Sequence, residues 1–392
     1  MCFDDFSFLI LVTLMISKLP NVTTSIFSVM SKMASDFNAI NLSQGFPNFE
    51  SDPLLIELVN KAMKDGFNQY APMPGDIGLR ATICEKVRLL HDRLYDIDKE
   101  ITITAGATQA IFTVLAALIK KDDEVIIFTP AYDCYEPTIK LFGGITRAVQ
   151  LEAPFFKPNW EKVENLINSH TKLIIINTPH NPSGAVFSRA DLLQLQKLTE
   201  KYNLLVLSDE VYEHIIFDDQ IHYSVSKFRA LSKRSFVVAS FGKTFHNTGW
   251  KIGYCLAPKL LMNEFKKIHQ YNVFSVNNPI QKALAIYLST PKNYLSLSSF
   301  YQKKRDLFLE LIKESKFKYH PTEGTYFQLL DFSSITDLSD LDFTEKLTKT
   351  HKLATIPTSV FNQNQSDNRQ IRVCFAKTND VLISAAKIIN SI

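Results

Sequence analysis

Cysteine is scarce in this sequence, and neither cysteine nor histidine is spaced as a metal site requires. The five cysteines in 392 residues are scattered and form no close pairs (Cys2, Cys84, Cys134, Cys255 and Cys374). Their spacing argues against zinc sites and against a disulfide framework, and it favours a reducing compartment. The histidines also lack ligand spacing, so structural or surface roles are expected for them (His180, His214, His222 and His246 among others). We therefore expect no metal.

An excess of charge and a membrane-spanning segment are missing as well. The 43 lysines and arginines exceed the 40 aspartates and glutamates by only three, so the overall charge favours neither nucleic acid nor an anionic membrane as a partner. The apolar run at residues 8–16 is too short to cross a bilayer, and Asp4 and Asp5 stand where a secretory signal carries positive charge. We predict a cytoplasmic protein and favour Met15 as its start. In the division of the chain we set residues 1–16 apart as a non-native or disordered extension. Secretion of the protein is the alternative interpretation.

Repeats, low-complexity segments and Pro- or Gly-rich linkers are also absent. Apolar residues make up 46% of the chain and charged residues 21%, which is typical of a globular enzyme. A chain of 392 residues suits one large and one small domain. We predict a large cofactor-binding domain at residues 51–285. The N-terminal arm, residues 17–50, joins residues 286–392 in the smaller domain.

From about Asp122 onward, short apolar runs rich in β-branched residues alternate with helical patterns. This alternation indicates a mostly parallel sheet covered by helices. The strands are predicted at residues 124–128, 173–177, 204–208, 236–240 and 252–257. We further expect an irregular arm at 20–50, helices at 53–64 and 77–89, and a long amphipathic helix at 291–314. Such sheets bind ligands at the carboxyl ends of their strands, and the site is expected there.

The densest chemical signal follows the predicted strand at 236–240. The segment VASFGKTFHNTGWK, residues 238–251, places Lys243 and Lys251 close together just after a buried strand. A lysine that forms a Schiff base must have a lowered pKa, and Lys251 together with partial burial would lower the pKa of Lys243. A lone lysine in such a turn is usually solvated. Taken alone, the segment leaves both interpretations open.

Polar groups also follow two other predicted strands. Asp209 could pair with a cationic ring nitrogen and make the ring an electron sink, or it could be a helix N-cap. Tyr212 could bind a cofactor phenolate or merely pack. Asn181 lies in the turn NTPHNPSG, residues 177–184, and offers a hydrogen-bonding amide at the same sheet edge. Together with Lys243, Asp209 and Asn181 place polar groups after three predicted strands, which indicates one site.

A phosphate site is predicted at residues 104–110. This segment, TAGATQA, opens an apolar helix with small residues, so free backbone N–H groups and the helix dipole can face an anion. A helix start of small residues is weak evidence by itself. Ser240 and Lys251 would add side-chain donors from other strands.

In this order, the segments resemble the fold-type I aminotransferases of class I and II, which use pyridoxal 5′-phosphate (PLP), and most closely the methionine and kynurenine/glutamine types. The resemblance runs from about Asn41 to the C-terminus. It rests on NLSQGFP (41–47), NQYAP (68–72), PAYDCY (130–135), NPSG (181–184), SFGKTFHNTGWK (240–251) and IRVCF (371–375). It implies an α/β fold, with a mostly parallel seven-stranded sheet between helices and a smaller α+β domain.

The resemblance also implies how PLP is held. Lys243 would bear PLP as a Schiff base and move the substrate proton. Asp209 would pair with the pyridine nitrogen, while Tyr212 and Asn181 bind the ring oxygen. Tyr132 would stack on the ring, and the phosphate would be held by Gly106, Ala107, Thr108, Ser240 and Lys251. Tyr70 would reach the phosphate in the neighbouring subunit, which implies a homodimer with shared active sites.

For the substrate, the resemblance implies that Arg372 clamps the α-carboxylate, because its planar fork matches a carboxylate in two parallel hydrogen bonds. Without the resemblance, such an arginine would more often form a surface ion pair. Substrate contacts are further expected from Asn181, Gly45, Phe46 and, in the partner's pocket, Phe274. Gly45 would let the arm approach the substrate closely.

Two departures from the aspartate-type pattern bear on specificity. Gly242 replaces a second phosphate-binding hydroxyl, and Lys251 stands where arginine is common. Both fit the methionine/kynurenine branch and disfavour dicarboxylate substrates. The expected aromatic lining favours sulfur-containing or aromatic side chains (Phe46, Tyr70, Tyr132 and Phe274). We predict a PLP-dependent aminotransferase that passes the amino group of a neutral amino acid to a 2-oxo acid, with methionine favoured and kynurenine, glutamine and Phe/Tyr-type donors also expected.

Two alternatives stay open. The same site could expel a leaving group from cysteine S-conjugates, which is β-lyase activity. The fold also serves as an effector-sensing domain in transcription regulators, but these need a DNA-binding domain, and only about forty residues precede the motifs. A catalytically inactive binding protein is disfavoured because every expected chemical group is present.

Overall fold

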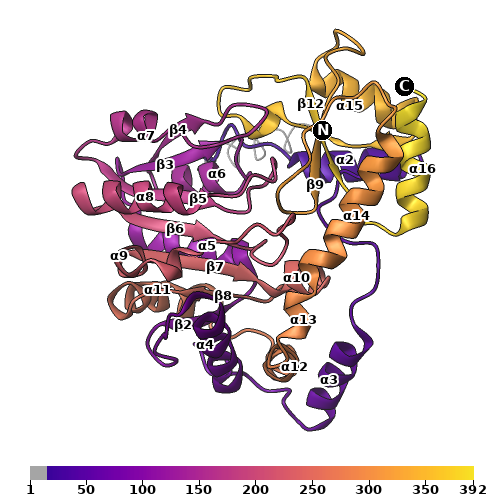
Figure 1. Cartoon of the computed structure of the whole chain (residues 1–392). Helices are drawn as coiled ribbons and strands as arrows, with labels where there is room; N and C mark the ends of the chain where they lie inside the picture. Colours follow the sequence, from indigo (N-terminus) through magenta and orange to yellow (C-terminus); the bar gives the residue numbers. More distant parts are fainter. Residues whose placement is uncertain (1–15) are drawn as a thin grey trace, which may run out of the picture.

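The computed structural model of the chain describes residues 16–392, so nearly all of the predicted extension lies outside the described residues. A seven-stranded sheet in the order β2-β8-β7-β6-β5-β3-β4 forms its centre (Figure 1). Only β8 runs antiparallel to its neighbours in this sheet; the other pairs are parallel. The strands are β2 (Ile101–Thr104), β3 (Glu124–Thr129), β4 (Ile145–Gln150), β5 (Thr171–Asn177), β6 (Leu205–Asp209), β7 (Ser235–Ser240) and β8 (Gly253–Leu256). The predicted α/β fold is confirmed.

Side chains alternate along each strand, and this divides the core into two layers. In β5, Leu173 and Ile175 belong to the apolar cluster that contains α5, α6 and α11. Ile174 and Ile176 belong to the cluster on the other face, which contains α4, α7 and α8. These helices are α4 (Ile77–His91), α5 (Ala107–Leu118), α6 (Tyr135–Leu141), α7 (Trp160–Leu166), α8 (Arg189–Lys201) and α11 (Lys259–Asn272). Because helices cover both faces, the central strands are continuous apolar runs.

The five predicted strands all exist, with ends that differ by one or two residues, but two further strands were not predicted. Strand β2 has only four residues, so its alternation of Ile and Thr is too short to mark a strand by itself. Strand β4 lies at the sheet edge, where exposed and buried positions are mixed and Arg147 is half-exposed. The sequence pattern therefore did not indicate β2, because it is short, or β4, because it lies at the sheet edge.

The C-terminal part builds a second sheet, in which β12 (Gln370–Cys374) lies between β11 (Ile356–Pro357) and β9 (Phe327–Asp331). Helices α14 (Leu297–Ile312) and α16 (Asn379–Asn390) run side by side next to it, with α15 (Asp340–Lys349) nearby (Figure 1). The arm belongs with this part, because β1 (Ile40–Asn41) pairs in parallel with β10 (Leu353–Ala354). The division into domains near residues 50 and 285 stays a prediction.

The arm was predicted to be irregular, but it contains helix α2 (Ile26–Asp36). The Ser25 side chain accepts a hydrogen bond from the Ser28 N–H at the helix start, and Met30 and Ala34 are buried four residues apart. This helix is short, which kept its apolar spacing from standing out.

The long helix predicted at 291–314 is two helices, α13 (Lys292–Leu295) and α14, separated by Ser296. Ser296 ends α13 by donating its N–H to the Lys292 carbonyl, while its own carbonyl accepts from Phe300. A one-residue interruption keeps the helical direction, so the apolar spacing does not register it.

The remaining helices are short or lie outside the central layers: α3 (Pro53–Lys64), α9 (Arg229–Ser232), α10 (Phe241–Thr244) and α12 (Asn278–Leu288). Three single 3₁₀ turns occur at Val225–Lys227, Thr248–Trp250 and Ser359–Phe361. None of the helices between residues 16 and 392 has the length and apolar character that a membrane crossing needs. The cytoplasmic location stays a prediction.

Candidate active site

A pocket of about 260 Å³ lies at the carboxyl ends of three neighbouring strands, at the predicted edge of the sheet. Asn177 ends β5, Asp209 ends β6 and Ser240 ends β7, and all three line it. Lys251 comes just before β8, and because β8 runs in the opposite direction, its start lies at the same edge. The predicted residues that line the pocket are Gly45, Gly106, Ala107, Thr108, Tyr132, Asn181, Asp209, Tyr212, Ser240, Lys243, Lys251 and Arg372.

Lys243 lies in the short helix α10, directly after β7. Its Nζ donates to the Gly45 carbonyl at 3.1 Å, and the Tyr326 hydroxyl donates to the same oxygen at 2.6 Å. Burial is the main reason that the pKa of Lys243 falls to about 8, and the positive charges of Arg372 and Lys251 act in the same direction. The sequence predicted both causes, Lys251 and partial burial, and burial contributes more. An amine with this pKa is partly unprotonated near neutral pH and can act as a base.

Asp209 is a buried acid that faces the pocket. Its Oδ2 accepts from the Tyr135 hydroxyl at 2.6 Å, and its Oδ1 accepts from the Val211 N–H at 3.3 Å. Residues 211–214 form a turn and no helix follows directly, so Asp209 is not a helix N-cap. Within residues 16–392 it has no ion-pair partner, and burial raises its pKa to about 6. A buried carboxylate of this kind is suited to pairing with a cationic ligand atom.

Arg372 comes from β12 and is fully buried, which rules out a surface ion pair. Its Nη1 donates to Asn181 Oδ1 at 2.7 Å, and its Nη2 donates to the Ser43 carbonyl at 3.0 Å. The guanidinium carbon lies 3.9 Å from the centre of the Phe327 ring. Its Nε has no partner within the described residues. Burial lowers the pKa of Arg372 to about 10, so at neutral pH it is a fixed cation beside the pocket.

The start of α5 borders the pocket and carries no side-chain cap. Gly106 precedes this helix with φ of 80°, and no side chain caps the first N–H groups. A Cβ at Gly106 would lie 3.6 Å from Nζ of Lys251, so the lysine passes close to the helix start. Uncapped N–H groups, the helix dipole and a lysine at one point favour a phosphate. Ser240 lines the same pocket.

Three predicted aromatic residues do not line this chain's pocket. Tyr70 and Phe274 are 80% and 52% exposed, and their rings meet edge to face with centroids 5.4 Å apart. Both were assigned to the partner's site, and these roles stay predictions. Phe46 was expected to touch the substrate, but its ring is 44% exposed and lies 5.0 Å from Nζ of Lys377 instead. Phe46 is therefore not part of the pocket lining, although the neighbouring Gly45 is.

Several residues of the site were not predicted, among them Tyr135, Asn177, Phe27 and Phe327. Tyr135 binds Asp209 and could have been found, since it ends the segment PAYDCY. Asn177 donates to the Asp209 carbonyl at 3.0 Å and accepts from the Asn181 N–H at 2.8 Å, and it too belongs to a segment that was singled out. Phe27 and Phe327 line the pocket from α2 and β9. Nothing local in the sequence marks these two, because only the fold brings their helix and strand to the site.

Three of the four histidines singled out in the sequence have buried side chains, and His246 is partly buried. His180 is buried and its Nδ1 lies 2.7 Å from the Ser183 hydroxyl. The side chains of His214 and His222 are also largely buried. The part of the chain that the structure describes contains no cluster of His, Cys, Asp and Glu that could hold a metal ion.

Gly184 closes the turn that presents Asn181, and replacing it with alanine should destabilise the protein by about 2–4 kcal/mol. The glycine has φ of +75°, and a Cβ there would lie 1.5 Å from Thr322 Oγ1 and 2.7 Å from the Gly324 carbonyl. Gly66→Ala is the control, because Gly66 has φ of +91° but nothing within 4 Å. Urea unfolding of both variants measures the difference. Equal losses of stability would contradict the steric argument.

Comparisons with known proteins identify the family of the chain. The family model described as aminotransferase class I and II matches residues 38–389. The methionine aminotransferase of Escherichia coli (strain K12) is 45% identical over 372 residues, which cover 95% of this chain and 96% of that protein. Kynurenine–oxoglutarate transaminase 3 of Homo sapiens is 32% identical, over 95% of this chain and 89% of that protein. The crystal structure of YbdL from Escherichia coli, identified as having a methionine aminotransferase function, matches with a TM-score of 0.93 at 44% identity, over 96% of this chain and 99% of that chain.

Proposed function

The chain belongs to the class I and II aminotransferases, and we propose that it uses PLP to pass the amino group of a neutral sulfur-containing or aromatic amino acid, methionine first, to a 2-oxo acid. Kynurenine, glutamine and Phe/Tyr-type amino acids are secondary donors in this proposal. The observation that carries it is the set of charges in the pocket: three cations, Lys243, Lys251 and Arg372, and one acid, Asp209.

The chemistry of the pocket fits PLP in three respects. Asp209 is a buried carboxylate without an ion-pair partner in the described chain, which suits a protonated ring nitrogen. Lys243 is an amine with a lowered pKa, which suits a Schiff base. The uncapped start of α5 beside Lys251 suits the phosphate. The remaining contacts in this proposal come from Tyr132 on the ring, from Tyr212 and Asn181 at the ring oxygen, and from Gly106, Ala107, Thr108 and Ser240 at the phosphate.

The residues of this chain divide the catalytic work. When bound, PLP supplies an electron sink and carries the amino group from one substrate to the next. Arg372 would orient the α-carboxylate of the substrate with its charge and its fork of N–H donors. Nζ of Lys243 would take the proton from the substrate's α-carbon and return it. Asp209 would hold the proton on the ring nitrogen.

The same charges support a neutral substrate side chain. In this assignment Lys243 serves the chemistry, Lys251 the phosphate and Arg372 the α-carboxylate, so the pocket lining offers no further cation to a second substrate carboxylate. Phe27, Tyr132 and Phe327 line the same pocket. Aromatic faces favour sulfur-containing and aromatic side chains. The pocket therefore favours methionine over aspartate.

A panel of amino donors tests this proposal. Purified protein loaded with PLP is mixed with methionine, phenylalanine, kynurenine, glutamine or aspartate, and the loss of the visible absorbance of bound PLP is followed in a single turnover. We expect methionine to react fastest and aspartate at least about 100-fold more slowly, which is about 2.7 kcal/mol. A spectrum that no amino acid changes would overturn the proposal, and equal rates with aspartate would overturn its specificity. Pyruvate and ammonia released from a cysteine S-conjugate would reveal β-lyase activity.

Arg372→Lys should lower kcat/KM for methionine about 100-fold, mainly by raising KM. Lysine keeps the charge but loses the planar fork, and a charge-assisted hydrogen bond contributes about 1.5–3 kcal/mol. The reaction with 3-methylthiopropylamine, which lacks the carboxylate, should change little. Arg305→Lys is the matched control, because Arg305 is buried and uses both Nη atoms on Asp218. An unchanged KM in Arg372→Lys would contradict the assigned role.

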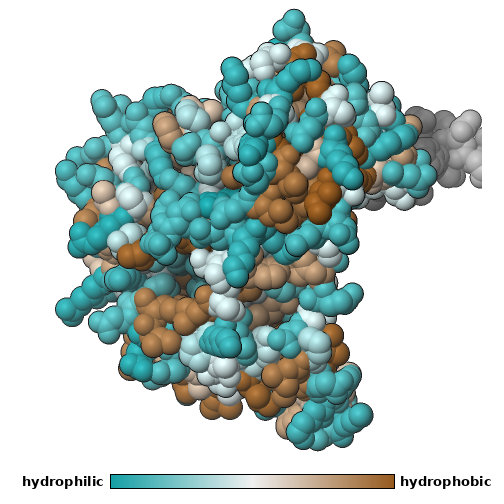
Figure 2. Space-filling model, turned by 45° about the vertical axis from the view of Figure 1, so that its right-hand side comes forward, coloured by the Kyte–Doolittle hydropathy of each residue, from teal (hydrophilic) through white to brown (hydrophobic). Residues whose placement is uncertain are grey.

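We also propose a homodimer with shared active sites. Exposed apolar and aromatic side chains, among them Tyr70, Tyr271 and Phe274, lie outside this chain's own pocket. Figure 2 shows several hydrophobic patches on the side of the molecule that it displays. In the dimer, Tyr70 would reach the phosphate of the neighbouring subunit. Light scattering measures the oligomeric state, and Tyr70→Phe should weaken PLP binding about tenfold through the loss of one hydrogen bond to an anion. A monomeric active protein would refute the shared site.

A further inference from the structure

The turn at residues 209–214 has two faces with different surroundings. Asp209 and Tyr212 line the pocket, three residues apart. Glu210 and Glu213 have the same spacing but do not line the pocket, and their side chains are almost fully buried in the protein. The proposed function uses the first pair and leaves the second pair of buried acids without a role.

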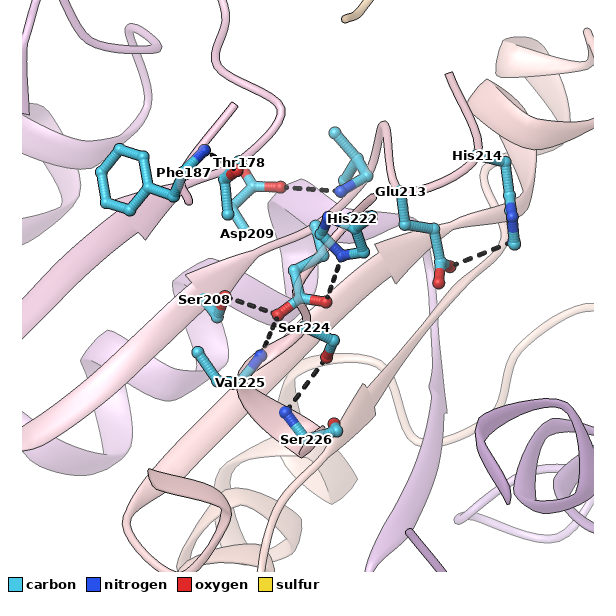
Figure 3. A network of polar contacts seen from close by, with 12 residues as sticks. Thr178, Phe187, Ser208, Asp209, Glu213, His214, His222, Ser224, Val225 and Ser226 are labelled. Atoms are coloured by element: carbon cyan, nitrogen blue, oxygen red, sulfur yellow. Dashed lines mark hydrogen bonds and ion pairs between the residues drawn. The ribbon is translucent and has the colours of Figure 1, made fainter. Parts of the chain in front are cut away.

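Glu210 is held from three sides. Its Oε1 accepts from the Ser208 hydroxyl at 2.7 Å and from the Val225 N–H at 3.1 Å, and its Oε2 lies 2.9 Å from Nε2 of His222. Figure 3 shows Ser208, His222 and Val225 around this carboxylate. Burial acts to raise the pKa of Glu210, but the hydrogen bonds from His222 and Ser208 and the charges of His222 and His91 together lower it, and the pKa lies below its ordinary value. Glu210 is therefore an ionised, fully bonded carboxylate.

Glu213 is tied to two other elements. Its Oε1 accepts from Lys86 Nζ of α4 at 2.5 Å and from the Tyr254 hydroxyl of β8 at 3.1 Å. Lys86 also donates to the Tyr254 hydroxyl at 2.8 Å, which closes a triangle of buried polar groups. His214 lies on the other side, with Nε2 3.6 Å from the same carboxylate oxygen.

Buried charges are costly unless they are paired and hydrogen-bonded, and replacing such pairs by apolar residues is often neutral or stabilising. The stability of the fold is therefore a weak explanation for two buried acids beside one short turn. Through their hydrogen bonds, the two acids fix the backbone of the turn to α4, to β8 and to the loop at residues 222–225. That backbone carries Asp209 and Tyr212.

We propose that Glu210 and Glu213 are positioning residues, whose buried contacts hold the turn so that Asp209 and Tyr212 face the cofactor in one fixed orientation. This inference rests on the proposed use of PLP. Displacement of a catalytic group by about 1 Å can cost about 100-fold in rate, so a turn held at several points preserves activity. The backbone supports the same role, because the Glu210 N–H donates to the Val238 carbonyl of β7, five residues before Lys243.

The test compares two buried glutamates of the same sheet. Glu210→Ala removes the acceptor for Ser208, Val225 and His222, and Glu210→Gln is the conservative variant. The control is Glu124→Ala: Glu124 is buried at the amino end of β3 and accepts from Arg147 and, at 2.8 Å, from Asn168 Nδ2. Both alanine variants lose a bonded buried acid, but only Glu210 adjoins the site. The readouts are the Kd for PLP, kcat and KM with methionine, the Tm, and hydrogen exchange of the backbone at residues 210–215.

We expect Glu210→Ala to raise the Kd for PLP about tenfold and to lower kcat about tenfold or more, with KM changed less than about threefold. Exchange at residues 210–215 should become faster, and Glu210→Gln should restore most of each property. Glu124→Ala should lower the Tm alone. If Glu210→Ala and Glu124→Ala differ in nothing but Tm, the inference is wrong.

Two further outcomes are distinguished. If Glu210→Ala does not fold, His222→Ala replaces it, because it removes one of the three contacts and leaves the carboxylate in place; kcat and exchange equal to those of the wild type then refute the inference. If the wild-type protein binds no PLP, the proposed function fails. In that case the inference about catalysis fails with it, while the exchange data still show whether Glu210 holds the turn.

Discussion

Replacing Lys243 with alanine should lower kcat/KM for methionine by about 10⁵–10⁶-fold, because the variant lacks both the amine that would bond to PLP and the base that would move the α-proton in the proposed function. The visible absorbance of the lysine-bound cofactor should vanish as well. Steady-state rates with methionine and a 2-oxo acid, together with absorbance spectra, measure the two effects. The fold should persist, since α10 contributes only four residues and its other contacts remain.

The matched control for this variant is Lys377→Ala. Lys377 is buried and its Nζ donates to the Phe46 carbonyl at 2.9 Å, while Lys243 donates to the carbonyl of the preceding residue, Gly45. Both variants therefore lose a buried hydrogen bond to the arm. Lys377→Ala should remain within about tenfold of the wild type, which corresponds to the loss of about one hydrogen bond. Comparable losses in the two variants would mean that the arm contact, and not the chemistry of Lys243, sets the rate.

The second large effect is expected at Asp209. Asp209→Asn keeps the shape of the side chain but removes the charge that would hold a proton on the ring nitrogen, so kcat/KM should fall about 10³-fold or more. The control is Asp340→Asn, because Asp340 is buried and accepts from the N–H and the hydroxyl of Ser359, both at 2.7 Å. A rate for Asp209→Asn within tenfold of the wild type would contradict the assignment.

The same substitution should stabilise the protein when PLP is absent. Burial raises the pKa of Asp209 to about 6 in the folded chain, above its unfolded value of about 3.8. The folded state therefore binds the proton more tightly, and stability falls as the pH rises from about 4 to about 6. Above pH 6 the penalty is complete, on the order of 2–3 kcal/mol. Denaturant unfolding of the PLP-free proteins at pH 4 and pH 7 should show this pH dependence in the wild type and its loss in Asp209→Asn.

The sequence predicted those parts of the fold and site that local pattern encodes. Apolar runs bounded by polar residues located five of the central strands, and the group that follows each strand located the pocket, since Asp209 and Ser240 end β6 and β7. Because parallel strands have their carboxyl ends at one edge of the sheet, the groups that follow these strands lie close together. The assignment to the aminotransferases is confirmed by the family match, while the role of each residue stays a prediction.

The parts that the sequence did not predict depend on contacts between distant segments. Phe27 and Phe327 are ordinary apolar residues of a helix and a strand until the fold brings both to the pocket. In the sequence, Glu210 and Glu213 look like solvated charges. The loop at residues 222–225 covers Glu210, and Lys86 of α4 and Tyr254 of β8 cover Glu213. The antiparallel direction of β8, which places Lys251 at the pocket, is likewise set by its neighbours in the sheet.

The pairing of β1 with β10 has a consequence for biosynthesis. Ile40 and Asn41 leave the ribosome early, but their partners Leu353 and Ala354 are made more than 300 residues later. At about 5–20 residues per second, the arm waits at least about fifteen seconds for its partner strand. When Leu353 and Ala354 have been made, the nascent chain contains Lys243 but not Arg372. The arm is therefore fixed only after most of the polypeptide has been made, and Arg372 is the last residue of the pocket lining to be translated.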